Sequence, residues 1–195
     1  MILLGLLKLC FASKEASKIH IRTAKIEDAP HIAKVHVDSW RTTYAGIVPD
    51  AFLYENLTYE SRTKSWEKQL QADETTILVA ENKQGELIGF ASGGRERSGK
   101  YKHVDGELYA IYLLQTYQGQ KIGFALVEAM AQSLLKQEFS AMLVWVLEQN
   151  SAKYFYEKLG GKRVDSDRLI ISGKSLLEIA YVWDNLKQLA HINRL

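Results

Sequence analysis

The chain has 195 residues, of which 47% are hydrophobic, and its formal net charge is +2. This composition predicts a globular chain with a hydrophobic core, and the balanced charge argues against nucleic-acid binding. Cys10 is the only cysteine, which excludes an intrachain disulfide, and the five histidines show no close metal-ligand spacing. We therefore expect a protein of a reducing compartment, the cytoplasm, without a bound metal.

The chain begins with MILLGLLKLCFASKEASK, in which Lys8 interrupts an apolar stretch. The stretch is too short to span a bilayer, and no basic residue precedes it as in a secretory signal. Its apolar residues match one face of a helix: Leu3, Leu6, Leu7, Cys10 and Phe11. We expect residues 1–17 to form a helical extension that covers the domain or the partner subunit of a homodimer, in preference to a role at a membrane. Residues 18–184 are expected to form one domain and residues 185–195 a helical tail.

The domain is predicted to begin with a strand and two helices. The alternation of IHIRTA predicts a strand at residues 19–24. Asp28 can cap a helix that runs from residue 29 to about residue 44. Thr58 can cap a second helix that ends near residue 72.

Strands are predicted to dominate the middle of the chain. TILVAEN (76–82) and ELIGFASGG (86–94) are separated by KQG, which predicts a hairpin. An unbroken apolar run, LYAIYLL (108–114), predicts a strand buried on both faces. The helical pattern after it extends to about residue 137, and MLVWVLE (142–148) predicts another buried strand.

A short helix and a second hairpin are predicted to complete the domain. Asn150 or Ser151 can cap the helix AKYFYEKL, which Gly160 and Gly161 close. RLIIS and LLEIAYVW, separated by GKS, predict the hairpin. Because strands mix with helices, the fold class is α/β or α+β. We expect a largely antiparallel sheet that is flanked by helices and becomes parallel at its centre.

The turn between the apolar strand and the next helix has an unusual charge. It reads YQGQKIGFA (117–125), and no acid occurs before Glu128, although the positive end of a helix dipole usually attracts one. Lys121 and two glycines stand there instead, an arrangement that suits a bound phosphate. The Walker and Rossmann sequences, GxxxxGK[ST] and GxGxxG, are both absent. From these residues alone, the turn is either an anion site or an ordinary helix start that contains two glycines.

Three segments, in order along the chain, resemble the GNAT superfamily of N-acetyltransferases. QGQKIG resembles the acyl-CoA pyrophosphate loop of that superfamily, Q/R-x-x-G-x-G/A, and GELYAIYLL resembles its fourth strand. LEQNSAKYFYEKLGG resembles its segment N-x-x-A-x-x-F-Y-x-x-x-G-F, and the resemblance spans about residues 19–183. Lys121 replaces the middle glycine of the loop, and we expect a negative φ at Lys121 because it has a side chain. Gly161 replaces the usual Phe of the third segment.

The resemblance implies a fourth strand that bulges and separates from the fifth, with acetyl-CoA in the gap between them. The backbone of the strand end would pair with the pantetheine arm, and the loop would cradle the pyrophosphate. Asn150 either contacts the cofactor or only caps its helix. The implied cofactor-binding residues are Leu113, Leu114, Gln118, Gly119, Gln120, Lys121, Ile122, Gly123, Phe124, Ala125 and Asn150. The phosphates of acetyl-CoA would then supply the negative charge that the turn lacks.

Acetyl transfer to an amine needs a base for the ammonium group and benefits from an acid for the departing thiolate. Glu107 is the only acid contiguous with the apolar strand, so it is the candidate for the base, acting directly or through water. The alternative is that Glu107 is only a solvated residue at the start of the strand. Asp105 is the second candidate for the base. The resemblance implies that Tyr156 is the acid, although it could be only a core aromatic. It also implies that Trp40 and Tyr44 cover the acceptor site, although most helix aromatics belong to the core.

The expected activity is the transfer of an acetyl group from acetyl-CoA to a primary amine of a small molecule or protein N-terminus by direct attack. One alternative is a non-catalytic acyl-CoA-binding sensor on the same fold, and another is a nucleotide-binding regulatory module. The loop before the apolar strand is basic, and it either is solvated or contacts a phosphate or an acidic acceptor: Arg95, Arg97, Lys100, Lys102 and His103.

Overall fold

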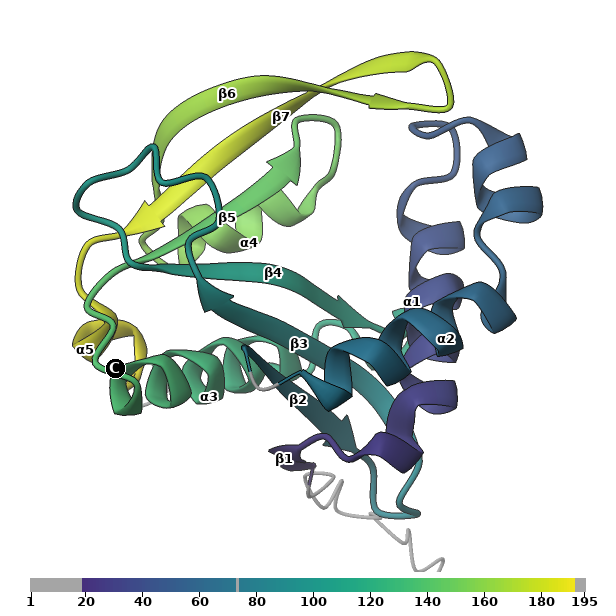
Figure 1. Cartoon of the computed structure of the whole chain (residues 1–195), viewed down its shortest axis with the longest axis horizontal. Helices are drawn as coiled ribbons and strands as arrows, with labels where there is room; N and C mark the ends of the chain where they lie inside the picture. Colours follow the sequence, from purple (N-terminus) through teal and green to yellow (C-terminus); the bar gives the residue numbers. More distant parts are fainter. Residues whose placement is uncertain (1–18, 73, 192–195) are drawn as a thin grey trace, which may run out of the picture.

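One seven-stranded sheet, with helices on both faces, forms the centre of the molecule in the computed structural model, which describes residues 19–72 and 74–191 (Figure 1). The strands are β1 (His20–Thr23), β2 (Thr75–Glu81), β3 (Leu87–Arg95), β4 (Gly106–Leu113), β5 (Met142–Leu147), β6 (Lys162–Ile171) and β7 (Lys174–Trp183). The α-helices are α1 (Ala29–Thr43), α2 (Tyr59–Gln71), α3 (Ile122–Lys136), α4 (Ala152–Lys158) and α5 (Leu186–Leu189). No helix among the described residues has the length and apolar character that crossing a membrane requires.

The elements follow the predicted order, and the differences concern the two ends of the chain and the start of β6. The extension expected at residues 1–17 lies outside the described residues, as do residues 192–195 of the expected helical tail. Within its described residues, 185–191, the tail forms the short helix α5. Strand β6 begins at Lys162 rather than at the predicted Arg168, because its exposed, polar first half pairs through its backbone with β7 and has no apolar alternation to reveal it.

The strands are arranged in the order β1-β2-β3-β4-β5-β7-β6, and every neighbouring pair is antiparallel except β4 and β5. These two strands pair only from Gly106 to Leu108 and then separate, as Figure 1 shows. The register of β3 against β4 shifts so that Tyr109 has no residue opposite it, which is a β-bulge. A bulge bends its strand, so it accounts for the divergence, and the predicted splayed central pair is confirmed.

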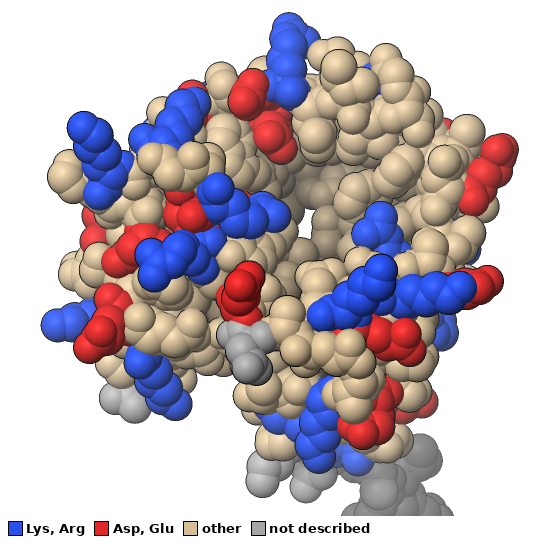
Figure 2. Space-filling model, viewed as in Figure 1, with Lys and Arg blue, Asp and Glu red and all other residues tan. Residues whose placement is uncertain are grey.

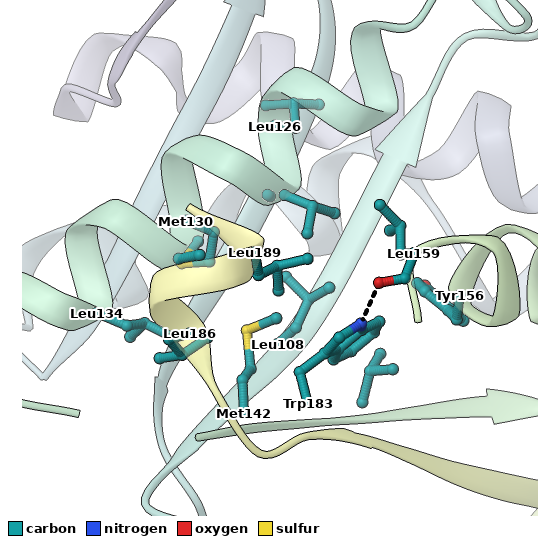
Figure 3. Packing of buried hydrophobic residues seen from close by; sticks show 14 of the residues in the cluster. Leu108, Leu126, Met130, Leu134, Met142, Tyr156, Leu159, Trp183, Leu186 and Leu189 are labelled. Atoms are coloured by element: carbon teal, nitrogen blue, oxygen red, sulfur yellow. Dashed lines mark hydrogen bonds between the residues drawn. The ribbon is translucent and has the colours of Figure 1, made fainter. Parts of the chain in front are cut away.

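Helix α3 covers one face of the sheet with an apolar stripe. Leu126, Met130 and Leu134 are fully buried against strand residues that include Leu108 and Met142 (Figure 3). The same core holds α4 and α5, and the indole N–H of Trp183 donates to the carbonyl oxygen of Leu159 at 2.9 Å. The Trp183 ring lies where a side chain at Gly161 would stand, 3.0 Å from an added Cβ, so the family's Phe would not fit there.

Helices α1 and α2 cover the opposite face, over β2, β3 and β4. The Thr58 side chain accepts the N–H of Ser61 at 3.1 Å and caps α2 as predicted. Asp28 precedes α1, but its carboxylate does not cap the helix. It binds the Arg22 guanidinium at 2.6 and 2.9 Å and the Lys25 N–H at 2.7 Å. The competing cation, brought close by β1, is the reason that the predicted cap is wrong.

The tip of the β6–β7 hairpin meets the connection between α1 and α2. Ile171 and Leu176 of the hairpin pack with Tyr44 and Leu53, and the Lys174 ammonium group donates to the carbonyl oxygen of Ile47 at 2.7 Å. Figure 2 shows that the middle of the molecule is hollowed between this contact and the sheet. The separated part of β4 and β5 therefore lies beside an open space.

Candidate active site

The turn after β4 presents unpaired backbone donors, as an anion site requires. Helix α3 begins at Ile122, and no described residue accepts the backbone N–H of Ile122, Gly123 or Phe124. The turn residues 118–121 are exposed, and the Gln118 amide donates to the Leu113 carbonyl oxygen at 3.2 Å, which ties the turn to the end of the strand. Free N–H groups at the positive end of a helix, next to an exposed turn, fit a pyrophosphate.

Lys121 stands in the left-handed region, with φ 63° and ψ 6°, so the negative φ expected for it is wrong. The turn keeps the backbone shape that the family's glycine would adopt without strain, although a lysine occupies the position. A residue with a Cβ pays about 1–2 kcal/mol for this conformation. The turn is therefore held by its surroundings, including Gly119 at φ 74°, and not by the preference of Lys121.

The edge of β4 that faces the gap carries unpaired backbone groups. The N–H of Leu114 donates to Ile88 on β3 at 2.9 Å, and the Leu114 carbonyl oxygen accepts the Tyr117 N–H at 2.9 Å. Because donors alternate along a strand, the N–H of Leu113 points away from β3, towards the side that β5 has left. Of the two predicted backbone positions, Leu113 therefore has the free donor.

Tyr156 of α4 is buried, with 5% of its surface exposed, and packs edge-on against Trp183 (Figure 3). Burial is the main cause that raises the pKa of its phenol, and the Tyr44 phenol adds to the effect. Within the described part of the chain, its hydroxyl has no hydrogen-bond partner. Tyr156 is thus a protonated phenol whose donor is unused.

Asn150 joins the two sides of the gap. Its side-chain oxygen accepts the Ala152 N–H at 2.9 Å at the start of α4, as a cap would, and its NH₂ group donates to the Tyr44 hydroxyl at 3.3 Å. The Tyr44 hydroxyl also lies 3.3 Å from that of Tyr112 on β4. The Trp40 ring lies 4.6 Å from the Tyr44 ring. The predicted cap and the predicted acceptor-side aromatics therefore meet at one place.

Glu107 is buried, with 3% of its surface exposed, on the sheet face that carries α1 and α2. Both of its carboxylate oxygens are occupied by Arg97. Oε2 accepts the backbone N–H at 3.2 Å and the side-chain Nε at 3.1 Å, and Oε1 accepts Nη2 in an ion pair. The Arg97 guanidinium also lies over the Tyr109 ring at 4.3 Å. Asp105 accepts the backbone N–H groups of Ser140 and Ala141, a structural role.

Two features were missed from the sequence. The Glu107–Arg97 ion pair joins residues whose sequence separation gives no periodic signal. Glu178 on β7 lies on the same sheet face as Glu107, directly opposite Asp167 of β6. A single acid inside the apolar strand LLEIAYVW was a signal that could have identified Glu178.

Among the described residues, no group of three or more His, Cys, Asp or Glu is placed to hold a metal ion.

Comparison with known proteins agrees with this geometry. The model of the Acetyltransferase (GNAT) family matches residues 36–161. An uncharacterized N-acetyltransferase of Bacillus subtilis, YuaI, is 43% identical over 171 residues, which are 88% of this chain and 96% of that protein. The spermidine N(1)-acetyltransferase of Thermoplasma acidophilum is 30% identical over 156 residues, covering 76% of this chain and 91% of that protein.

A solved structure is similar over most of its length. The PaiA N-acetyltransferase of Thermoplasma acidophilum, in complex with coenzyme A, matches with a TM-score of 0.62 and 26% identity, covering 83% of this chain and 98% of that one. The chain therefore belongs to the GNAT acetyltransferase family and is an acyltransferase that uses acetyl-CoA as its co-substrate.

Proposed function

We propose that this enzyme transfers the acetyl group to a primary amine, which attacks the thioester directly. The observation that carries the proposal is the separation of β4 from β5 beyond Leu108 and Val144. The separation leaves a gap between the two strands. The free N–H groups of α3 lie towards one face of the sheet, and Trp40, Tyr44 and Glu107 lie towards the other face. Two substrates can then approach from opposite faces and meet where the strands part, so no covalent enzyme intermediate is needed.

On the α3 side, the pyrophosphate is proposed to lie on the loop Gln118–Ala125. The free N–H groups at the helix start and the charge of Lys121 support this position. The pantetheine arm would run along β4, where Leu113 has an unused donor. A backbone N–H of this edge would also stabilise the thioester oxygen as it becomes negative.

Tyr156 is proposed to give its hydroxyl proton to the departing thiolate. Its raised pKa keeps the phenol protonated at neutral pH, and its donor has no other partner in the described part of the chain. Asn150 and Tyr44 are proposed to hold the two sides of the gap together through their hydrogen bond. Trp40 is proposed to form part of the wall of the acceptor site.

The acceptor is proposed to be a small, positively charged amine, for which polyamines are the first class to test. Three carboxylates lie on the sheet face that carries α1 and α2, where the acceptor is proposed to bind: Glu107, Asp167 and Glu178. Their negative charge favours the binding of an ammonium group. The spermidine acetyltransferase relative supports the same class. One of these carboxylates would take the amine's proton, and Glu107, the candidate from the sequence, could do so only if Arg97 released it.

The test is thiol release from acetyl-CoA across a panel of amines that contains a polyamine, a diamine, an amino acid and a short peptide. Turnover is expected with the polyamine above the background hydrolysis of acetyl-CoA. In parallel, acetyl-CoA is expected to raise the Tm as its concentration exceeds its Kd, whereas ATP and NAD leave it unchanged. A Tm shift without turnover of any amine would instead favour the non-catalytic acyl-CoA sensor.

A further inference from the structure

Glu178 occupies a position where a carboxylate is unexpected. It lies in β7 between Leu176 and Ala180, which share its face and pack into apolar clusters. Opposite it on β5 is Leu147, the last residue of that strand, beyond the point where β5 and β4 cease to pair. Glu178 is therefore one strand away from the gap, at the level where the gap is open, on the face of α1 and α2.

The Glu178 carboxylate has no hydrogen-bond or ion-pair partner among the described residues, although it is partly buried. Burial raises its pKa, and the negative charges of Asp167 on β6 and Glu107 on β4 raise it further, while Arg97 acts in the opposite direction. A partly buried carboxylate without a partner destabilises the fold, and such groups with a raised pKa concentrate at functional sites.

Two other candidates on this side of the sheet are less suited to accept a proton. Arg97 holds both oxygens of Glu107, so protonation there would break an ion pair and a backbone hydrogen bond. His36 of α1 is buried among aromatic rings, and this burial lowers its pKa to about 3. A histidine with so low a pKa is a weak base near neutral pH.

We propose that Glu178 is the carboxylate that takes the proton from the ammonium group of the acceptor, directly or through one water; this inference rests on the proposed function. The ammonium N–H bond breaks, its proton passes to a Glu178 oxygen, and the freed electron pair forms the C–N bond at the thioester carbon. The C–S bond breaks, and the thiolate takes the proton of Tyr156. The nitrogen then loses a second proton, which restores Tyr156 through water, and Glu178 returns its own proton to solvent.

The test compares kcat/KM across pH for the parent, Glu178→Gln and Glu107→Gln, with the amine that the parent turns over best. Glu178→Gln keeps the size of the side chain and is expected to lower kcat/KM about 10²-fold near neutral pH. The loss should shrink at high pH, where the amine deprotonates unaided. The affinity for acetyl-CoA, measured by calorimetry, should not change. Glu107→Gln should keep the fall of kcat/KM at low pH that the parent shows.

Asp167→Asn gives a second readout that a structural role for Glu178 would not produce. It removes a like charge opposite Glu178, so the pKa of Glu178 should fall and the low-pH decline of kcat/KM should move to lower pH. Asp184→Asn is the matched control, because it removes the same charge from an exposed residue whose partner is Lys162, and it should move nothing.

Each outcome is decisive. If Glu178→Gln retains the parent's kcat/KM and pH profile while the parent is active, the inference is wrong and the proposed function stands. The same conclusion follows if Glu107→Gln alone abolishes the low-pH decline. If acetyl-CoA binds the parent but no amine releases thiol, the proposed function and the inference fail together.

Discussion

Substitution of Lys121 separates its backbone conformation from its charge. At φ 63° a glycine is unstrained, whereas a residue with a Cβ pays about 1–2 kcal/mol. Lys121→Gly recovers this energy, less the greater entropy of glycine in the unfolded chain, so a net gain of roughly 0.5–1 kcal/mol is expected. For a chain of this size, that gain corresponds to a Tm rise of about 1–4 °C.

The charge of Lys121 is expected to act on the affinity for acetyl-CoA. Lys121 is exposed, and two unit charges about 4 Å apart in water interact by about 1 kcal/mol. Lys121→Gly should therefore weaken binding slightly. Lys121→Glu reverses the charge, so the change is about 2 kcal/mol, or a roughly 30-fold weaker Kd.

Calorimetric titration of the three proteins with acetyl-CoA, at low and high salt, is the assay. The Debye length falls from about 30 Å at 0.01 M to about 3 Å at 1 M, so the difference between Lys121→Glu and the parent should nearly vanish at high salt. If Lys121→Glu binds as tightly as the parent at low salt, Lys121 points away from the phosphates. If Lys121→Gly does not raise the Tm, the turn does not strain Lys121.

Three further substitutions test the mechanism and the fold. Tyr156→Phe is expected to lower kcat about 10²-fold with little change in the Kd of acetyl-CoA, because only a proton donor is removed; an unchanged kcat with chemistry rate-limiting would leave Tyr156 as a packing residue. Trp183→Phe should destabilise the fold by about 1–3 kcal/mol in urea unfolding, because a buried carbonyl oxygen loses its donor; a smaller loss would mean that water replaces the indole. Arg22→Met should destabilise the fold by about 1–3 kcal/mol at pH 7, because two carboxylates lose their hydrogen-bond donor. Arg22 lowers the pKa of Asp28 and Glu81, so this stabilisation is present above their ordinary values of 3.8 and 4.5 and is lost as pH falls through the lower folded values. A loss that is equal at pH 7 and pH 3 would contradict that linkage.

The sequence by itself determined the order of the elements and the place of the glycine-containing turn that is proposed to hold the phosphates. Both depend on short-range signals: the apolar run of β4, the helical stripe of α3, the Thr58 cap and the glycines of the turn. The family segments added the splayed strand pair, which the structure shows as pairing that ends at Leu108. These features repeat or adjoin within a few residues, so they can be read along the chain.

Only the tertiary structure decided which charged groups have an ion-pair partner. Arg97 reaches Glu107 because a loop folds back onto β4, and Arg22 takes Asp28 away from the helix start because β1 lies beside it. Likewise, the surrounding fold holds Lys121 in a conformation that its own preference opposes. Glu178 has no such partner in the described part of the chain. The sequence shows that Glu178 stands in an apolar strand, but it does not show whether a cation pairs with it. The physical reason is that an ion pair or a backbone strain depends on groups brought together in space, whereas periodicity and caps depend on near neighbours in sequence.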